Sequence, residues 1–506
     1  FFSIADAGDL NGVAGMKQGL GVDLRPFFVL DAKHHRTEPS RDRDDFEFDA
    51  GLDLFYSITS RSKLSVSINT DFAETEVDDR QVNLTRFPLF FPERRDFFLE
   101  DSGVFVFAND NAVIPFFSRR IGLDSANGEV PLTAAAKFTA QTDEFSVGVL
   151  NVQTDDAGNL DGQNLSVGRF SANILEQSDI GVIWTHGDPT SDRRADTYGL
   201  DLNLRTTEFL GDRNLRFNAY AVRSDNEAAA GEEDGNDTAF AMSLAYPNDE
   251  ISANISWTTV EERFDPSLGF VRRPGSKTYE GSFSYRPRQY TEIRRFIFEV
   301  EPQLVTDSGN NTQTVDFDTV PFGIEWESGD EFFVLASHRR EVLDEDFAIA
   351  DDVTIPAGSY GFGRASLLAI ASDRRPFAGS LELGFGDFFD GTRSSVEANL
   401  DVRRFDPLVL SLEYEYDDID LEGGSFDVHT ARTRVEFQFT PEVTWSNVLQ
   451  YDNVTDALGW NARLWWIPQP GRELFLVANQ GWEVTGGDFD PTASQYTFKL
   501  GTTLRF

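Results

Sequence analysis

The sequence predicts an all-β protein: a single transmembrane antiparallel β-barrel of about 26 strands (range about 22–26) with an internal plug segment. The barrel is expected to take in the whole of residues 1–506. Three observations predict it. Short alternating strands recur along the whole chain, short turns alternate with long acidic connections, and the last strand is aromatic and ends on Phe506.

The strands alternate apolar and polar residues, so each has one apolar and one charged face. In residues 408–417, LVLSLEYEYD, the leucines and tyrosines share one face, and the serine, glutamates and aspartate share the other. Residues 431–439, ARTRVEFQF, place Arg432 and Arg434 opposite Val435 and Phe437 in the same way. In a soluble sandwich the apolar face would form the core, whereas in a membrane barrel it meets lipid and the charged face lines a wet lumen.

The connections favour the barrel. Turns such as 468–471, 440–442, 405–407 and 246–249 are short, and they alternate with expected long acidic loops. Alternation of this kind is typical of a barrel with one periplasmic rim and one outer rim. An even strand number places both termini in the periplasm, so we expect a location in the bacterial outer membrane. The expected long loops are 482–495, 418–427, 344–358 and 224–237.

The final strand, residues 496–506, has the aromatic alternation and terminal phenylalanine that resemble the assembly signal of outer-membrane barrels. It implies two partners, the barrel-assembly machinery and the outer-membrane lipid with its lipopolysaccharide. The residues expected to carry this signal are Tyr496, Phe498, Leu504 and Phe506.

Composition excludes several classes of function. The formal net charge of -42 repels nucleic acid, so no nucleic-acid partner is expected. The chain has no cysteine, which removes disulfides and thiolate metal sites. Its five histidines lie in no nucleophile-elbow or metalloenzyme motif, so we predict that the protein is not an enzyme.

Residues 73–112 are too long and too apolar for a simple loop. Their centre, RFPLFFPERRDFFLE at 86–100, combines phenylalanines, two prolines and clustered charges, which suits neither a helix interior nor a two-faced strand. We expect the segment to fold into the lumen as a plug or constriction, its phenylalanines forming a small core and its arginines pairing with wall carboxylates. The predicted plug or gate residues are Arg86, Phe90, Phe91, Glu93, Arg94, Arg95, Phe97, Phe98 and Glu100.

The stretch VNLTRFPLFFPERRDFFLE, followed by FFSRRIG and later by FDPSLGFVRR, resembles a family of large bacterial outer-membrane barrels of unknown function. The resemblance is strongest at residues 70–122 and 264–273. Members of that family commonly follow a module similar to family-9 carbohydrate-binding domains, which implies a link to carbohydrate. The chain departs from the family at Asp96, where proline is usual, at Asp101, where glycine is usual, and at 134–140, where the family is richer in glycine.

No cofactor is predicted, although acidic loops on the outer rim could bind Ca²⁺ through carboxylates and carbonyls. They could equally bridge cations to lipopolysaccharide or stay solvated. The residues considered for such a site are Asp234, Asp237, Asp344, Asp346, Asp351 and Asp352.

The function expected from these features is that of a porin-like channel, transporter or export conduit with a charged, plugged lumen, in a Gram-negative bacterium. An alternative is a structural scaffold or sheath that binds a periplasmic or luminal protein partner. A third hypothesis, a membrane-embedded hydrolase, requires a serine or aspartate beside a histidine on neighbouring lumen or rim positions.

Overall fold

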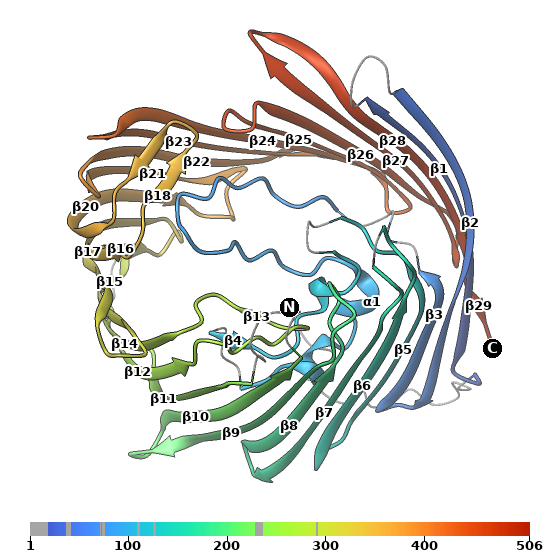
Figure 1. The fold of residues 1–506 in the computed structure, drawn as a ribbon, viewed down its shortest axis with the longest axis horizontal. Helices are drawn as coiled ribbons and strands as arrows, with labels where there is room; N and C mark the ends of the chain where they lie inside the picture. The colour runs from blue at the N-terminus through green and yellow to red at the C-terminus, as the bar shows by residue number, and fades with distance from the viewer. Residues whose placement is uncertain are drawn as a thin grey trace.

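Alternation of apolar and polar residues produces a closed barrel wall. The computed structural model describes residues 19–36, 42–70, 72, 76–108, 112–124, 128–158, 160–227, 236–289 and 292–506. Within these residues, 24 antiparallel strands form the barrel, and a short extra strand, β29 (Leu504–Arg505), pairs with the first strand. The predicted fold class is confirmed, with two strands fewer than the central expectation of 26. Figure 1 shows the wall from one mouth.

The first half of the wall runs from the N-terminal strand to the middle of the chain. Its strands are β1 (Val22–Arg36), β2 (Asp42–Thr59), β3 (Ser62–Thr70), β5 (Leu132–Gln141), β6 (Phe145–Thr154), β7 (Asn164–Leu175), β8 (Ser178–His186), β9 (Ala195–Phe209), β10 (Arg213–Asn226), β11 (Thr238–Pro247), β12 (Ile251–Val260) and β14 (Ser276–Tyr285).

The second half returns to the first strand. Its strands are β15 (Ile293–Asp307), β16 (Thr312–Trp326), β17 (Glu331–Leu343), β20 (Gly358–Ala371), β21 (Phe377–Phe388), β22 (Gly391–Phe405), β23 (Leu408–Leu421), β24 (Gly424–Thr440), β25 (Val443–Asp452), β26 (Ala457–Gln469), β27 (Arg472–Thr485) and β28 (Asp488–Thr502).

Pairing of β1 with β28 closes the barrel, with Phe28 opposite Leu500 and Leu30 opposite Phe498. Closure leaves no unpaired strand edge, which a lipid-embedded sheet requires. Val22 and Thr502 lie at the same rim, where the turns between neighbouring strands are short.

The two faces of the wall differ in chemistry, as β9 illustrates. Its outward residues Tyr198 and Leu200 are 46% and 51% exposed, whereas the inward Asp201 and Asn203 are buried. The same outward exposure recurs at Leu244, Phe283 and other apolar positions around the wall. An apolar outside with a polar inside is the pattern of a barrel that faces lipid.

Two expected long loops are wrong, because the strands continue through them. β27 and β28 are separated only by 486–487, and β23 and β24 only by 422–423. Their acidic composition suggested loops, but strand pairing continues to the hairpin tips, with Thr485 opposite Asp488 and Leu421 opposite Gly424, so acidic residues occupy strand positions. Of the other two, 344–358 contains the small hairpin β18 (Phe347–Ala350) and β19 (Val353–Ile355), and residues 228–235 lie outside the described residues.

The lumen contains the chain between β3 and β5 (Figure 1). Its described elements are the short helix α1 (Asp96–Leu99), the 3₁₀ turns η2 (Ser102–Phe105) and η3 (Ser118–Arg120), and the two-residue strand β4 (Val113–Ile114). The inserted segment was expected to end at residue 112. β4 follows this position but pairs with β13 (Phe270–Val271) inside the barrel, so the inserted segment continues past residue 112. Among the described residues, no helix is long and apolar enough to cross a membrane.

Candidate functional site

The candidate site is the luminal segment, residues 76–108 and 112–123, together with the wall it contacts. Of the predicted plug at 73–112, residues 73–75 and 109–111 lie outside the described residues. The segment divides into two parts by burial. Every residue from 76 to 92, here called the arm, is exposed or half-buried, whereas the remainder, here called the anchor, contains fully buried side chains.

The anchor packs on one side of the wall through apolar side chains. Phe98, Phe105 and Ile121 join a buried cluster with inward residues of β5 to β7, including Leu150 and Val167. A second cluster joins the anchor to β8 and β10 to β12; its members include Phe107, Ala108, Val113, Ile183, Tyr220, Val222 and Phe264. Burial of several phenylalanines stabilises this docking by about 1.5–3 kcal/mol per side chain.

A buried ion pair lies beneath the second cluster. Arg169 of β7 donates two hydrogen bonds to Asp201 of β9, at 2.5 and 2.9 Å, and both side chains are almost fully buried. Asp201 also accepts a 3.1 Å hydrogen bond from the backbone N–H of Ala108, and Arg169 lies over the Phe107 ring. The wall therefore binds the anchor backbone directly.

The positions that depart from the family pattern have a structural role. Asp96 is the first residue of α1, a position that favours proline or an acidic residue. Asp101 adopts φ 56°, a left-handed conformation that glycine reaches more easily, and its carboxylate accepts a hydrogen bond from Thr139. Lys137, within the departing stretch 134–140, donates to the carbonyls of Phe97 and Glu100 and so caps α1.

The two stretches that carry the family resemblance meet in the lumen. The loop 264–273 folds inward, so that Phe117 N–H donates to the Leu268 carbonyl at 2.8 Å. Phe90 stacks on Phe117 at 4.8 Å between ring centroids and contacts the edge of Phe270 at 5.2 Å. Residues about 150 positions apart in sequence thus build one aromatic cluster.

Glu93 and Arg95 fix the start of the anchor. Arg95 donates to both oxygens of Glu93 and to the carbonyls of Ser118 and Ile121, all within 2.8 Å. Burial alone would raise the pKa of Glu93, but the hydrogen bonds from Arg95 and Ser118 outweigh it and lower that pKa. Arg95 was expected to pair with a wall carboxylate. It pairs within the segment instead, because Glu93 is two residues away and equally buried.

The arm crosses the lumen to the opposite wall, where its contacts are mainly ionic. Arg80 pairs with Asp452 at the end of β25, at 2.6 Å, and Arg86 pairs with Glu341 of β17, also at 2.6 Å. Leu84 adds an apolar contact to the cluster around the β18–β19 hairpin. Of the expected wall pairs, only that of Arg86 occurs.

A cluster of arginines holds the base of the arm. Arg434 and Arg463 of the wall contact Glu76 at 3.3 and 3.0 Å, and Arg432 contacts Asp79 at 2.6 Å. From the anchor, Arg94 contacts Glu76, Asp78 and Asp79 at 3.2–3.5 Å, and Arg119 pairs with Asp78. Arg94 was expected to pair with wall carboxylates. It pairs instead with carboxylates of the arm, and the wall contributes arginines to the same cluster. We call this group the arginine hub; its members are Arg94, Arg119, Arg432, Arg434 and Arg463.

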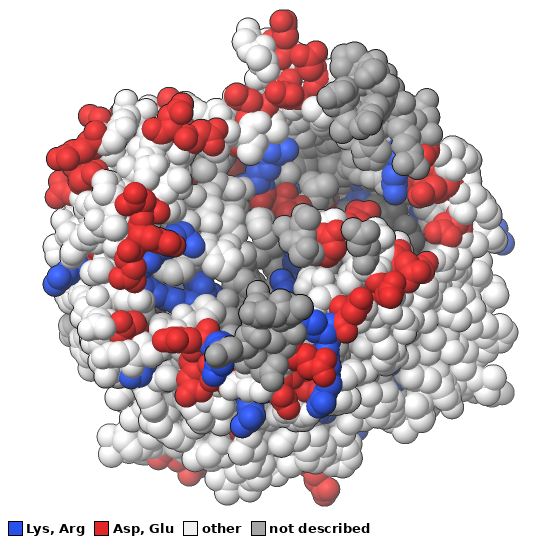
Figure 2. Space-filling view, in the orientation of Figure 1, with Lys and Arg blue, Asp and Glu red and all other residues white. Residues whose placement is uncertain are grey.

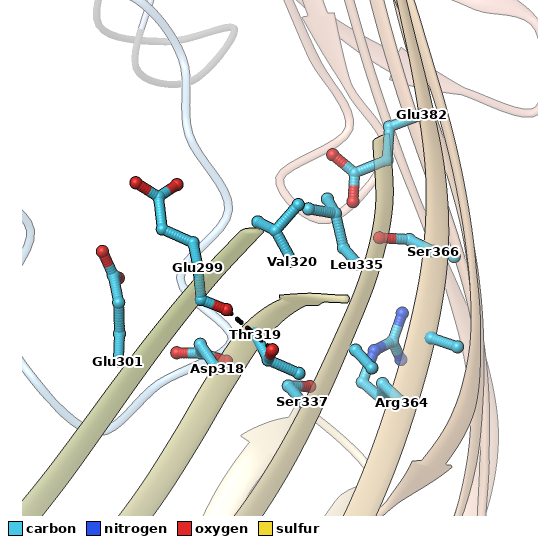
Figure 3. A pocket seen from close by; sticks show the side chains of 13 residues that line it. Glu299, Glu301, Asp318, Thr319, Val320, Leu335, Ser337, Arg364, Ser366 and Glu382 are labelled. Carbon is cyan, nitrogen blue, oxygen red and sulfur yellow. Dashed lines mark hydrogen bonds between the residues drawn. The ribbon is translucent and has the colours of Figure 1, made fainter. Parts of the chain in front are cut away.

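One open space adjoins the arm, and a second lies on the wall of the barrel. A cavity of about 1080 Å³ lies between residues 77–84 and the inner faces of β24 to β28, and Asn461, Asn479 and Gln495 contribute to its lining. A second, of about 390 Å³, lies on the wall formed by β15 to β21. Figure 3 shows carboxylates projecting from neighbouring strands there. Within the described part of the chain, Glu301, Asp318 and Glu382 make no ion pair. Arg364 shares the lining with them, so carboxylates outnumber cations there.

The remaining predicted residues occupy separate places. Phe91 lies under Arg119, Phe97 packs edge-on against Phe98, and the Glu100 carboxylate pairs with Lys63. Tyr496, Phe498, Leu504 and Phe506 lie at the closing seam of the barrel, and Tyr496, Leu504 and Phe506 are about half exposed. Their assembly role stays a prediction.

The aspartates considered for Ca²⁺ do not gather in the described chain. Asp234 lies outside the described residues, Asp237 accepts a hydrogen bond from Arg263 N–H, and Asp346 accepts one from Ala357 N–H. No group of three or more metal-ligating side chains occurs among the described residues. Acidic side chains do gather around the mouth shown in Figure 2.

A serine, a histidine and an aspartate face one another across three strands. Ser166 of β7 is opposite His186 of β8, which is opposite Asp196 of β9. His186 Nδ1 lies 2.9 Å from Asp196, but Ser166 accepts its hydrogen bond from Asn151 and makes none to His186. The row therefore lacks the serine–histidine contact that activates a nucleophile.

A closed barrel of 24 strands with an apolar outside, a polar inside and short turns at one rim has the architecture of bacterial outer-membrane proteins. The chain is an outer-membrane β-barrel. Residues 20–158, which include the arm and the anchor, match a family described as a domain of unknown function (DUF5916). No curated protein matches the chain.

Solved structures similar to the chain include two receptors and a third protein, OpdQ. The siderophore receptor PirA from Pseudomonas aeruginosa has 9% identity and a TM-score of 0.45, covering 95% of this chain and 80% of its own. The ferric preacinetobactin receptor BauA from Acinetobacter baumannii has 10% identity and a TM-score of 0.38, with coverage of 95% and 80%. Pseudomonas aeruginosa OpdQ has 10% identity and a TM-score of 0.30, with coverage of 96% and 98%.

Proposed function

We propose that the protein is a gated passage for solutes across the outer membrane, in which the arm is the gate and the anchor is its fixed mount. The observation that carries this proposal is the contrast in contact chemistry along one segment. The anchor buries phenylalanines and covers the hydrogen-bonded Arg169–Asp201 pair of the wall, whereas the arm has no fully buried residue and meets the opposite wall mainly through ion pairs.

This contrast matters because the two kinds of contact differ in strength. A partly exposed ion pair contributes about 0–1 kcal/mol, so the ionic contacts of the arm together are worth only a few kcal/mol. Contacts of that size allow local opening while the buried anchor stays docked. The cavity of about 1080 Å³ beside the arm gives the passage a starting volume that arm movement would enlarge.

The passage is expected to prefer cations. Glu301, Asp318 and Glu382 lie on the wall of β15 to β21, and none makes an ion pair in the described part of the chain. Arg86 of the arm docks on β17 of the same wall. A lumen lined by one sign of charge raises the local concentration of the opposite ion.

A reversible tether between the arm and the wall tests the gate. Arg80 and Asp452 are in contact, and the chain has no cysteine, so Arg80→Cys with Asp452→Cys gives a unique thiol pair. A reducible bis-methanethiosulfonate reagent joins them, and dithiothreitol releases them. The measurement is conductance in planar bilayers before tethering, after tethering and after reduction.

We expect tethering to abolish openings and reduction to restore them in the same membrane. The two single-cysteine variants, treated with the same reagent, control for modification alone. A tether verified by mass spectrometry that leaves the openings unchanged would show that the arm is not the gate.

A further inference from the structure

The arginine hub is unusual for its surroundings. The chain carries a formal charge of -42, yet five guanidiniums converge at the base of the arm. In the docked arrangement they face four carboxylates of the described chain, three from the arm and Glu413 of β23, which contacts Arg432 at 3.2 Å. If the arm leaves, Glu76, Asp78 and Asp79 leave with it. Among the described residues, Arg94, Arg119, Arg432 and Arg434 then keep one acidic neighbour, Glu413.

The arm carboxylates also fit the hub imperfectly. Arg432 Nη2 lies 2.6 Å from Asp79, but its N–H groups are not directed at that oxygen, and the buried Nε and Nη2 atoms of Arg432 find no hydrogen-bond acceptor. The buried Nε of Arg94 has none either. A guanidinium is most strongly bound when its planar fork meets two oxygens in line, so the docked arm leaves binding capacity unused.

We propose that the arginine hub is a binding site for a multivalent oxyanion of the phosphate class, and that the arm carboxylates occupy it when the arm is docked. A phosphate-type anion presents oxygens in several directions, which matches guanidiniums arriving from the anchor and from two strands of the wall. Anion binding and arm docking then exclude each other. This inference rests on the proposed gate, because the anion would act by displacing the arm.

The position of the hub indicates the source of the ligand. Arg432 is in register with Gln450, whose side chain hydrogen-bonds the backbone of residues 78 and 80, so the hub faces the lumen. Lipid headgroups lie on the opposite side of the wall. The ligand is therefore a dissolved anion that enters the barrel.

Titration calorimetry with inorganic pyrophosphate, on the folded barrel in detergent at fixed ionic strength, tests the site. Glu76→Gln with Asp78→Asn and Asp79→Asn removes the three competing arm carboxylates while keeping their shape. Because the competitor is lost, we expect pyrophosphate to bind at least about tenfold more tightly than to the unchanged protein. Arg434→Gln with Arg463→Gln is expected to reduce the affinity by a similar factor.

Arg216→Gln is the matched control, because Arg216 of β10 is exposed and lies apart from the hub. We expect it to bind pyrophosphate as the unchanged protein does. Retention of the folded, heat-modifiable form on gels shows that each variant forms a barrel. Equal affinity in the carboxylate-free variant and the unchanged protein, or undiminished binding after loss of Arg434 and Arg463, would overturn the proposal.

The measurement separates this proposal from the gate. Calorimetry reports binding whether or not the barrel conducts, so the hub proposal can fail while tethering still abolishes openings. Conversely, tight binding in the carboxylate-free variant together with unchanged conductance under tethering would support the site and reject the gate.

Discussion

Gly269 lies directly against the backbone of Ile114, so closely that a Cβ added to Gly269 would sit 2.1 Å from the Ile114 carbonyl oxygen. The contact joins β13 to β4 and brings the inward loop 264–273 onto the anchor. Because the obstructing atom belongs to the backbone, it cannot move aside as a flexible side chain can.

Replacing Gly269 with alanine is therefore expected to separate β4 from β13 and loosen the anchor by about 1–3 kcal/mol, the usual cost of overpacking. Hydrogen exchange at residues 113–121 measures the change. Gly361→Ala, at a β20 position with open space around it, is the matched control and should leave exchange unchanged. Equal protection in the two variants would contradict the assigned role of Gly269.

Removing one partner of the Arg169–Asp201 pair is expected to cost more anchor stability than neutralising both partners. Arg169→Met leaves a buried carboxylate without its partner and should cost about 3–5 kcal/mol of anchor stability. The double variant Arg169→Met with Asp201→Asn removes that stranded charge and keeps an acceptor for Ala108 N–H, so it should cost less. The opening free energy at the Ala108 amide, from hydrogen exchange, distinguishes the two; a larger cost for the double variant would refute this account.

Acid is expected to release the start of the anchor. The folded state lowers the pKa of Glu93 below its ordinary value of 4.5, so its contacts stabilise the anchor above pH 4.5. That stability is lost as the pH falls from 4.5 through the folded pKa. Protease sensitivity of residues 93–100 should rise in this window, and Glu93→Gln should remove that pH dependence. An unchanged acid profile in the variant would assign the effect to other groups.

Cation preference is expected to depend on the wall of β15 to β21. In a barrel without the arm, Glu301→Gln with Glu382→Gln should lower the permeability ratio of K⁺ to Cl⁻ severalfold. Glu208→Gln with Asp212→Asn, at the rim end of β9 and in the turn that follows it, is a matched double neutralisation and should leave the ratio unchanged. Reversal potentials in a KCl gradient measure the permeability ratio of both variants. An equal drop in the two would show that the net charge of the protein, and not the wall of β15 to β21, sets the cation preference.

Local patterning in the sequence was sufficient to predict the wall, because a period of two specifies which face each residue takes. The central estimate of 26 strands exceeded the observed 24, which lies within the expected range of 22–26, and β4 pairs inside the lumen instead of joining the wall. Local patterning also mistook acidic hairpin ends such as 482–495 for loops, because composition does not show where a strand leaves the membrane.

The luminal contacts were less predictable because they join distant parts of the chain. Arg432 and Arg434 were visible as paired arginines on the polar face of a strand in a very acidic chain, and this was the available signal for the hub. Their partners, Glu76 and Asp79, lie more than 350 positions earlier, and period-2 patterning carries no information about such pairs. Arg95 was assigned to the wall because the sequence pattern does not show which carboxylate an arginine meets, although its partner Glu93 is only two residues away.

The most direct test of the central claim is single-channel conductance in planar bilayers after residues 77–91 are replaced by a short Gly/Ser linker, with the anchor left intact. If the arm is the gate, the replacement should give a large, steadily open pore where the intact barrel is mostly closed. If the folded variant conducts no better than the intact barrel, the arm does not control the passage, and the lumen is better explained as a scaffold for a partner.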